Sequence, residues 1–123
     1  MTTTLRRPSH RTGDAVLLEQ PLASDIQLIE VLKAVADPVR LTLITVMHDG
    51  EYHPCRAEVY AVDLHKSTLS HHFKVMREAG ITSTRILGRN REMRLRKEDL
   101  DARFPGLVDS LVTAHAAGVH SGT

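Results

Sequence analysis

Apolar and polar residues alternate at helical spacing over much of the chain, beginning near residue 24. The apolar positions of the first such segment are Ile26, Ile29, Leu32 and Val35. This spacing predicts a helix, and Ser24 with Gln27 three residues later has the pattern of a capping box that would start it. A second helix is predicted after Asp37-Pro38, with the aspartate as N-cap and the proline at the first helical position. Asp49-Gly50 ends it.

The next helical pattern is the most clearly two-sided one. Residues 51–64 have a weak pattern, in which we expect a loop and a short third helix. Residues 66–80 then predict a fourth helix that ends at Gly80. Its apolar face consists of Leu69, Phe73 and Met76. Successive helical residues turn by roughly 100°, so His72 falls at the edge of this face and His71 nearly opposite to it.

The last part of the chain predicts a hairpin and one more helix. Two strand-like segments, residues 81–85 and 91–95, flank a short turn that contains Gly88. A final helix is expected after Pro105, and its apolar side is formed by Leu107, Val108, Leu111, Val112 and His115. Nothing after it in the chain can cover this side, so we expect it to pack against a second copy of the protein.

Composition agrees with a small helical domain. The chain has 123 residues, of which 41% are apolar but only 3% aromatic, so the core must be aliphatic. We expect a flexible arm over residues 1–22, one domain over residues 23–116 and a tail over residues 117–123. No apolar run of about 18 residues exists to span a membrane. Without a secretory signal, and with Cys55 as the single cysteine, a cytoplasmic location is expected.

The charge of the chain is concentrated in one segment. Residues 66–97 contain nine basic and two acidic residues, a net charge of +7, whereas the remainder holds seven basic and thirteen acidic residues, a net charge of −6. A charged run is often only a solvated face. Here it coincides with a helix and a hairpin, which favours a surface for nucleic acid over a solvated face.

The two adjacent histidines fit this surface better than they fit a metal site. Two ligands on one helix need a spacing of three or four residues, so His71 and His72 do not form a chelate. We expect His72 to brace the helix and His71 to face DNA. The outer face suited to the major groove comprises Lys66, Ser67, Thr68, Ser70, His71, Lys74 and Arg77. The hairpin would contact the backbone through Arg85, Arg89, Asn90 and Arg91.

Two sequence blocks resemble the ArsR family of bacterial winged-helix regulators. LKAVADPVRLTLI and HKSTLSHHFKVMREAGI occur in order and are followed by RILGRNREMRLR, and the resemblance covers roughly residues 25–114. It implies a mainly α-helical winged helix-turn-helix with a β-hairpin wing, forming a homodimer through its first and last helices. It further implies a repressor that binds a pseudo-palindromic site on double-stranded DNA. The implied dimer contacts are Ile29, Leu32, Leu107, Val108, Leu111 and Val112.

The sequence is compatible with more than one kind of effector. Arsenic and cadmium sensors of this family carry a C-x-C pair where this chain has only Cys55, and the last helix lacks the ligand spacing of the zinc sensors. We therefore expect that no cofactor is required. One alternative is a derepressor that senses a metal through His48, His53 and Cys55, with His10 as a further ligand. A redox switch at Cys55 is another, and a small organic effector or none is the reading we favour.

Two other classes of function agree less well with the sequence. The chain has no phosphate-binding loop, nucleophile elbow or zinc-protease motif, so we expect no enzymatic activity. A winged-helix module that docks another protein is the stronger rival. Protein docking does not require that the fourth helix and the hairpin both be cationic, which favours DNA as the partner.

Overall fold

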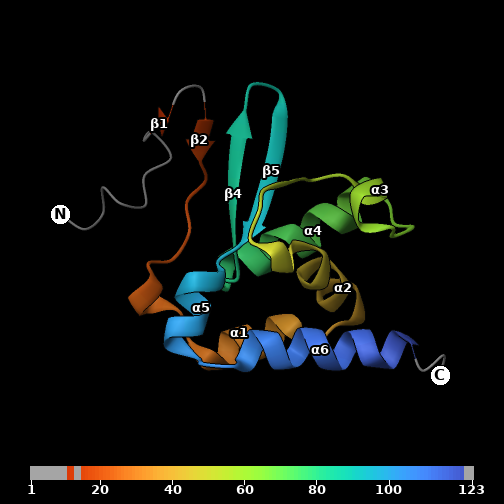
Figure 1. The fold of residues 1–123 in the computed structure, drawn as a ribbon. Coiled ribbons are helices and arrows are strands. Elements are labelled where there is room, and N and C mark those ends of the chain that lie inside the picture. The colour runs from red at the N-terminus through yellow and green to blue at the C-terminus, as the bar shows by residue number, and fades with distance from the viewer. Residues whose placement is uncertain (1–10, 13–14, 121–123) are drawn as a thin grey trace.

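The computed structural model describes residues 11–12 and 15–120, and the side chains of residues 15–118. Within them it contains six α-helices and a five-stranded sheet (Figure 1). The helices are α1 (Leu28–Val35), α2 (Pro38–Val46), α3 (Ala57–Tyr60), α4 (Lys66–Glu78), α5 (Lys97–Arg103) and α6 (Leu107–His120). The strands are β1 (Arg11–Thr12), β2 (Ala15–Leu17), β3 (His53–Pro54), β4 (Thr82–Leu87) and β5 (Asn90–Leu95). Two short 3-10 helices span Ala23–Asp25 and Met47–Asp49.

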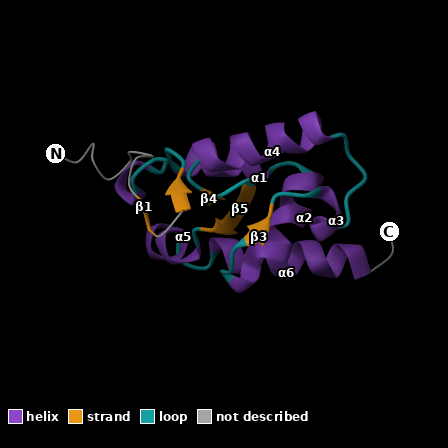
Figure 2. Cartoon of the chain, turned by 90° about the horizontal axis from the view of Figure 1, so that it is seen from above, coloured by secondary structure: helices purple, strands orange, loops and turns teal. Residues whose placement is uncertain are grey.

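The predicted hairpin is present and projects from the helical body. β4 and β5 pair antiparallel from Thr82↔Leu95 to Leu87↔Asn90, with Gly88 and Arg89 in the turn. The sheet order is β1-β2-β4-β5-β3, with antiparallel neighbours throughout. Seen from above, α4 and α6 lie on opposite sides of the molecule (Figure 2). The fold is therefore a helical body that carries a β-hairpin wing, formed by β4 and β5, and ends in the long helix α6.

The segment before the first helix contains structure that the sequence pattern did not predict. A flexible arm was expected through residue 22, but Ala15–Leu17 form β2, which pairs with β4 in the register Ala15↔Leu87 and Leu17↔Arg85. The Leu18 amide then donates to the Thr84 carbonyl at 2.9 Å. A free sheet edge is a ready template for another strand, and here the chain supplies that strand itself.

The start of the first helix also differs from the prediction. No capping box forms at Ser24, because the backbone of Ile26 and Gln27 is extended and α1 begins only at Leu28. Ile26 is almost fully buried and packs against Gly80. Inserting this side chain into the core turns the chain inward, and that tertiary contact overrides the local capping signal.

Two of the other predicted helix boundaries, the Asp37 cap and the Gly80 end, are confirmed. The Asp37 carboxylate accepts hydrogen bonds from the Val39 and Arg40 amides at 2.8 and 3.1 Å, which caps α2 as expected. α4 ends at Gly80, whose φ of 86° permits the Ile81 amide to reach back to the Met76 carbonyl at 2.9 Å. This cap fixes the angle at which the wing leaves the helix.

The expectation that the last helix has no cover within its own chain is wrong. α6 packs along α2 and α5, and Val108 and Val112 belong to the core of the single chain. His115 is tied to the same neighbour, since its Nε2 lies 3.1 Å from Thr42 Oγ1 on α2. The large apolar side chains left exposed in the described residues lie instead on α1, at Leu28, Ile29 and Leu32.

Among the described residues, no helix is both long and apolar enough to cross a membrane.

Candidate nucleic-acid interface

Helices α3 and α4 follow each other in the chain, and both pack against α2. Tyr60, at the end of α3, is buried against Phe73 of α4 with their ring centroids 5.8 Å apart. Ala61 then adopts a left-handed conformation with φ of 55°, which turns the chain toward the start of α4. The aromatic contact fixes the first of these two helices against the second, as a helix-turn-helix requires.

The outer face of α4 is polar, cationic and open to solvent. The predicted groove-facing residues Lys66, Ser67, Thr68, Ser70, His71 and Lys74 are all exposed. The first turn of α4 contains no acidic residue, so its backbone amides and positive helix dipole are uncompensated there. The opposite face holds Leu69, Phe73 and Met76 in the core, as the pattern predicted. The arrangement can therefore present donors to base edges or to phosphate.

Arg77 differs from the other predicted contacts because it is half-buried. It lies near Arg91 of the wing, and burial together with repulsion from the Arg91 charge lowers the pKa of the Arg77 guanidinium. Two cations held close together lose free energy unless an anion joins them.

His72 braces α4, as its position at the edge of the apolar face predicted. Arg40 of α2 places Nη1 3.0 Å from His72 Nδ1 and also donates Nε to the Ala34 carbonyl of α1. A guanidinium can only donate, so His72 Nδ1 must be the unprotonated acceptor. Burial lowers the pKa of His72, while the Asp37 carboxylate partly opposes this and Arg40 adds to it. One contact network thus joins α1, α2 and α4.

Acid is expected to destabilise the protein through His72. The pKa of His72 in the folded protein lies below its ordinary value of 6.5. As the pH falls through 6.5, the unfolded chain therefore binds more protons than the folded chain, and the free energy of unfolding decreases. Urea unfolding from about pH 7.5 to about pH 5 should show a falling free energy of unfolding. The fall should be smaller in His72→Asn, whose amide oxygen can accept from Arg40, and unchanged in the exposed control His71→Asn. Equal pH dependence in all three proteins would contradict this role for His72.

The wing divides into an exposed tip and a tethered base. Arg89, Asn90 and Arg91 at the tip are exposed. Arg85 was predicted to join them, but its Nε and Nη2 both lie 2.8 Å from the Glu92 carboxylate. Its guanidinium also stacks 3.8 Å above the ring centroid of Tyr52. Arg85 is therefore already neutralised and holds the wing to the segment before β3.

The three weak metal candidates do not converge on one point. His48 Nε2 pairs with Asp109 at 2.7 Å, and His53 Nε2 pairs with Asp49 at 2.9 Å. The described residues contain no group of three or more His, Cys, Asp or Glu side chains that could hold a metal ion. His10 lies outside the described residues. Burial raises the pKa of the Cys55 thiol to about 11, which disfavours the thiolate that both metal binding and oxidation require.

Sequence reasoning missed two sets of interactions at this site. Nothing in the pattern connects Arg40 with His72, because the two residues are 32 positions apart. Tyr52 lies in the segment of weak pattern, so its stacking with Arg85 was not foreseen either. Both depend on the three-dimensional packing of elements whose existence, but not whose mutual placement, the pattern indicates.

The fold and this cationic surface together define a winged helix-turn-helix DNA-binding protein. Comparison with known proteins agrees. Residues 37–84 match the family described as bacterial regulatory protein, arsR family. A Bacillus subtilis (strain 168) protein described as the uncharacterized HTH-type transcriptional regulator YceK is 33% identical over 90 residues, which are 72% of this chain and 90% of that protein. The chain belongs to the arsR family of bacterial regulatory proteins, and it is a DNA-binding transcriptional regulator.

Proposed function

We propose that the protein is a transcriptional repressor that binds a pseudo-palindromic operator as a homodimer. The observation that carries this proposal is the exposed cationic face of α4 beside an exposed cationic wing tip, both within the segment of net charge +7. α4 would enter the major groove with its first turn nearest the bases. The wing tip would follow the adjacent backbone or minor groove.

The homodimer is proposed from the apolar surface of α1. Val31, Ala34 and Val35 face the core, yet the opposite side of the same helix is also apolar, and Ile29 is 60% exposed. Leu28 and Leu32 extend this stripe. Exposed apolar stripes of this kind mark protein contacts. A two-fold partner on α1 would bury the stripe and present two copies of α4 to successive turns of DNA.

The contribution of α6 to this interface is narrower than the sequence indicated. Val108 and Val112 pack inside their own chain, so little of either side chain is left for a partner. Leu107 and Leu111 are partly buried against the same core and can border the interface. The proposed dimer contact is therefore centred on α1, with the edge of α6 beside it.

Replacing Arg89 with alanine should weaken DNA binding without regard to sequence. Because a wing-tip arginine mostly meets phosphate, affinity for specific and random DNA should fall alike, by about three- to tenfold. The slope of log affinity against log salt should decrease by about one. Fluorescence anisotropy over a range of salt concentrations measures both quantities.

Arg94→Ala is the matched control for this test, because Arg94 lies in the same hairpin but on the sheet face that carries Ser83. We expect it to weaken DNA binding less than Arg89→Ala does, because Arg94 adds to the positive potential of the wing without contacting phosphate itself. A fall confined to specific DNA in Arg89→Ala would show that Arg89 reads bases. Equal losses in both variants would mean that net charge alone, and not the wing tip, sets affinity. A protein-docking module, the rival function, would show neither loss.

A further inference from the structure

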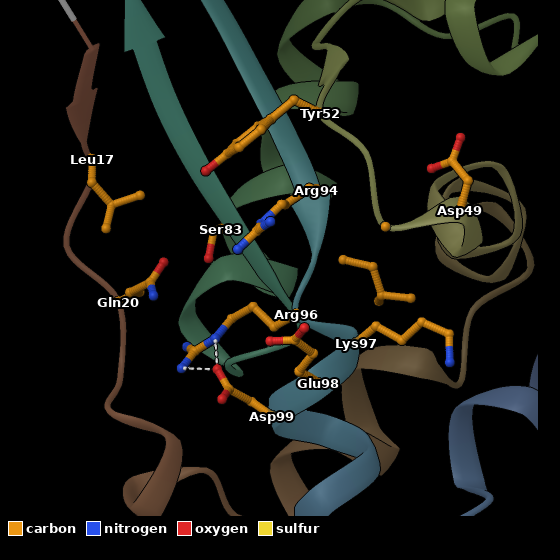
Figure 3. Close-up of a pocket in the computed structure, with 12 residues that line it drawn as sticks. Leu17, Gln20, Asp49, Tyr52, Ser83, Arg94, Arg96, Lys97, Glu98 and Asp99 are labelled. Atoms are coloured by element: carbon orange, nitrogen blue, oxygen red, sulfur yellow. Dashed lines mark hydrogen bonds and ion pairs between the residues drawn. The ribbon is translucent and has the colours of Figure 1, made fainter. Parts of the chain in front are cut away.

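A cavity of about 420 Å³ lies between the N-terminal segment and the sheet (Figure 3). Leu17 and Gln20 approach it from the N-terminal segment, and Ser83 and Arg94 approach it from the strands β4 and β5. Its volume falls in the range of small-molecule sites. The cavity exists because β2 pairs with the edge of β4 and the chain then arches toward Arg96, which donates to the Pro21 carbonyl at 2.7 Å.

Strand register places three complementary side chains side by side on the floor of this cavity. Ser83 pairs with Arg94, and His53 pairs with Met93, so Tyr52 stands next to Arg94 on the same face. The Arg94 guanidinium carbon lies 5.3 Å from the centroid of the Tyr52 ring. Figure 3 shows Arg94 extending across the sheet toward Ser83, with Tyr52 on one side and Arg96 on the other. An aromatic ring, a guanidinium and a hydroxyl thus form one row.

The polar groups of this row lack partners of their own. Ser83 is only 6% exposed, yet its hydroxyl makes no hydrogen bond to any described residue. Among the described residues, no carboxylate lies within salt-bridge distance of the Arg94 guanidinium. The Ser83 hydroxyl is therefore available to a ligand, and a guanidinium without a carboxylate partner beside it can bind an anion.

Most of the other charged side chains that line the cavity are already paired. Arg96 is paired with Asp99 at 3.0 Å, and Lys97 is paired with Asp101 at 2.8 Å. Asp49 is paired with His53 at 2.9 Å, and Glu98 and Arg94 are both exposed. Arg94 is therefore the one cation of the lining without a carboxylate partner among the described residues. A single positive charge suits a monoanion better than a dianion such as phosphate.

We propose that this cavity binds a small organic monocarboxylate, with its carboxylate on Arg94 and Ser83. The apolar body of the ligand would lie against Leu17 and Tyr52, which also line the cavity. A carboxylate matches the planar fork of arginine and can accept from the serine hydroxyl at the same time. The ligand would contact the N-terminal segment, the wing and the segment before β3 together.

The ligand is also proposed to lower DNA affinity, a step that rests on the proposed function. Arg94 belongs to the same strand as Arg91, and a bound anion there removes positive potential from the base of the wing. It also adds a contact between β2 and the sheet that can shift the wing relative to α4. A coupling of about fivefold between carboxylate and DNA is the expected size.

Binding is tested on the protein alone by NMR titration. Acetate, benzoate, phenylacetate and 4-hydroxybenzoate are the probes, each up to about 20 mM, above the millimolar dissociation constants typical of weak small ligands. Benzyl alcohol serves as the uncharged control. We expect saturable shifts of the Leu17, Ser83 and Leu95 amides with at least one aromatic carboxylate and none with the alcohol. Arg94→Gln should weaken that binding by about tenfold, whereas Arg89→Gln on the wing tip should not.

Several outcomes overturn the proposal. It fails if no carboxylate produces saturable shifts, if benzyl alcohol binds as well, or if Arg94→Gln binds as tightly as the natural protein. The regulatory step is measured separately, by anisotropy of the DNA complex with and without the bound carboxylate. An unchanged DNA affinity would overturn that step alone. Absence of DNA binding in every condition would instead refute the proposed function and leave the carboxylate result intact.

Discussion

Replacing Ile29 with aspartate is expected to convert the proposed dimer to a monomer. Operator affinity should then fall by roughly 100-fold or more, because each subunit would bind its half-site alone. A charge placed in an apolar interface must be desolvated without a partner, which is among the costliest single changes. Since Ile29 is 60% exposed in the single chain, the fold of each subunit should survive. Light scattering gives the mass, and circular dichroism confirms the helical content.

Glu30→Ala is the matched control for this variant. Glu30 lies on the same helix and is exposed, but it points away from the stripe of Leu28, Ile29 and Leu32. We expect it to remain dimeric and to keep its DNA affinity. A dimeric Ile29→Asp protein would refute the α1 interface. A monomeric Ile29→Asp protein with full operator affinity would refute the requirement for a dimer.

Replacing Gly80 with alanine should cost about 3 to 4 kcal/mol of unfolding free energy. Two effects add here. The φ of 86° is unfavourable for any residue with a Cβ atom, and that Cβ would lie 2.6 Å from Cγ1 of the buried Ile26. Three atoms of the Ile26 side chain surround the position, so the clash cannot be relieved by moving one flexible end. Urea denaturation at a fixed protein concentration measures the loss.

The second glycine of this region separates the two effects. Gly88 in the wing turn also has a positive φ, of 64°, but an added Cβ there would meet nothing within 4 Å. Gly88→Ala should therefore cost only about 1 kcal/mol, the backbone part alone. Combining Gly80→Ala with Ile26→Ala should cost less than the sum of the two single changes, because the clash is absent in the double variant. Equal losses for both glycines would contradict the packing argument.

The parts of the fold that could be predicted are those set by local pattern. The Asp37 cap, the apolar face of α4 and the Gly80 terminus all depend on residues within a few positions of one another, and all three are present. The same pattern separates His71 from His72 correctly, since the direction of a helical side chain follows from its position alone. The winged helix-turn-helix fold could be predicted from the sequence because these local signals occur in order along the chain.

The parts that could not be predicted depend on contacts between distant segments. β2 has only three residues and gains its structure from the edge of β4. The start of α1 is displaced because Ile26 is drawn against Gly80, 54 residues away in the chain. Arg85 was expected to contact DNA as one arginine among several, but in the structure it pairs with Glu92 across the hairpin. No periodicity indicates which of several arginines already has a partner.

The most direct test of the central claim is fluorescence anisotropy of the purified protein on the DNA upstream of its own gene, with random DNA as competitor and salt as the variable. If α4 and the wing bind DNA, random DNA should fail to displace the protein from the upstream DNA. The logarithm of the affinity should fall linearly with the logarithm of the salt concentration, with a slope that reflects several phosphate contacts. Binding that is absent, or that is indifferent to salt, would contradict the account.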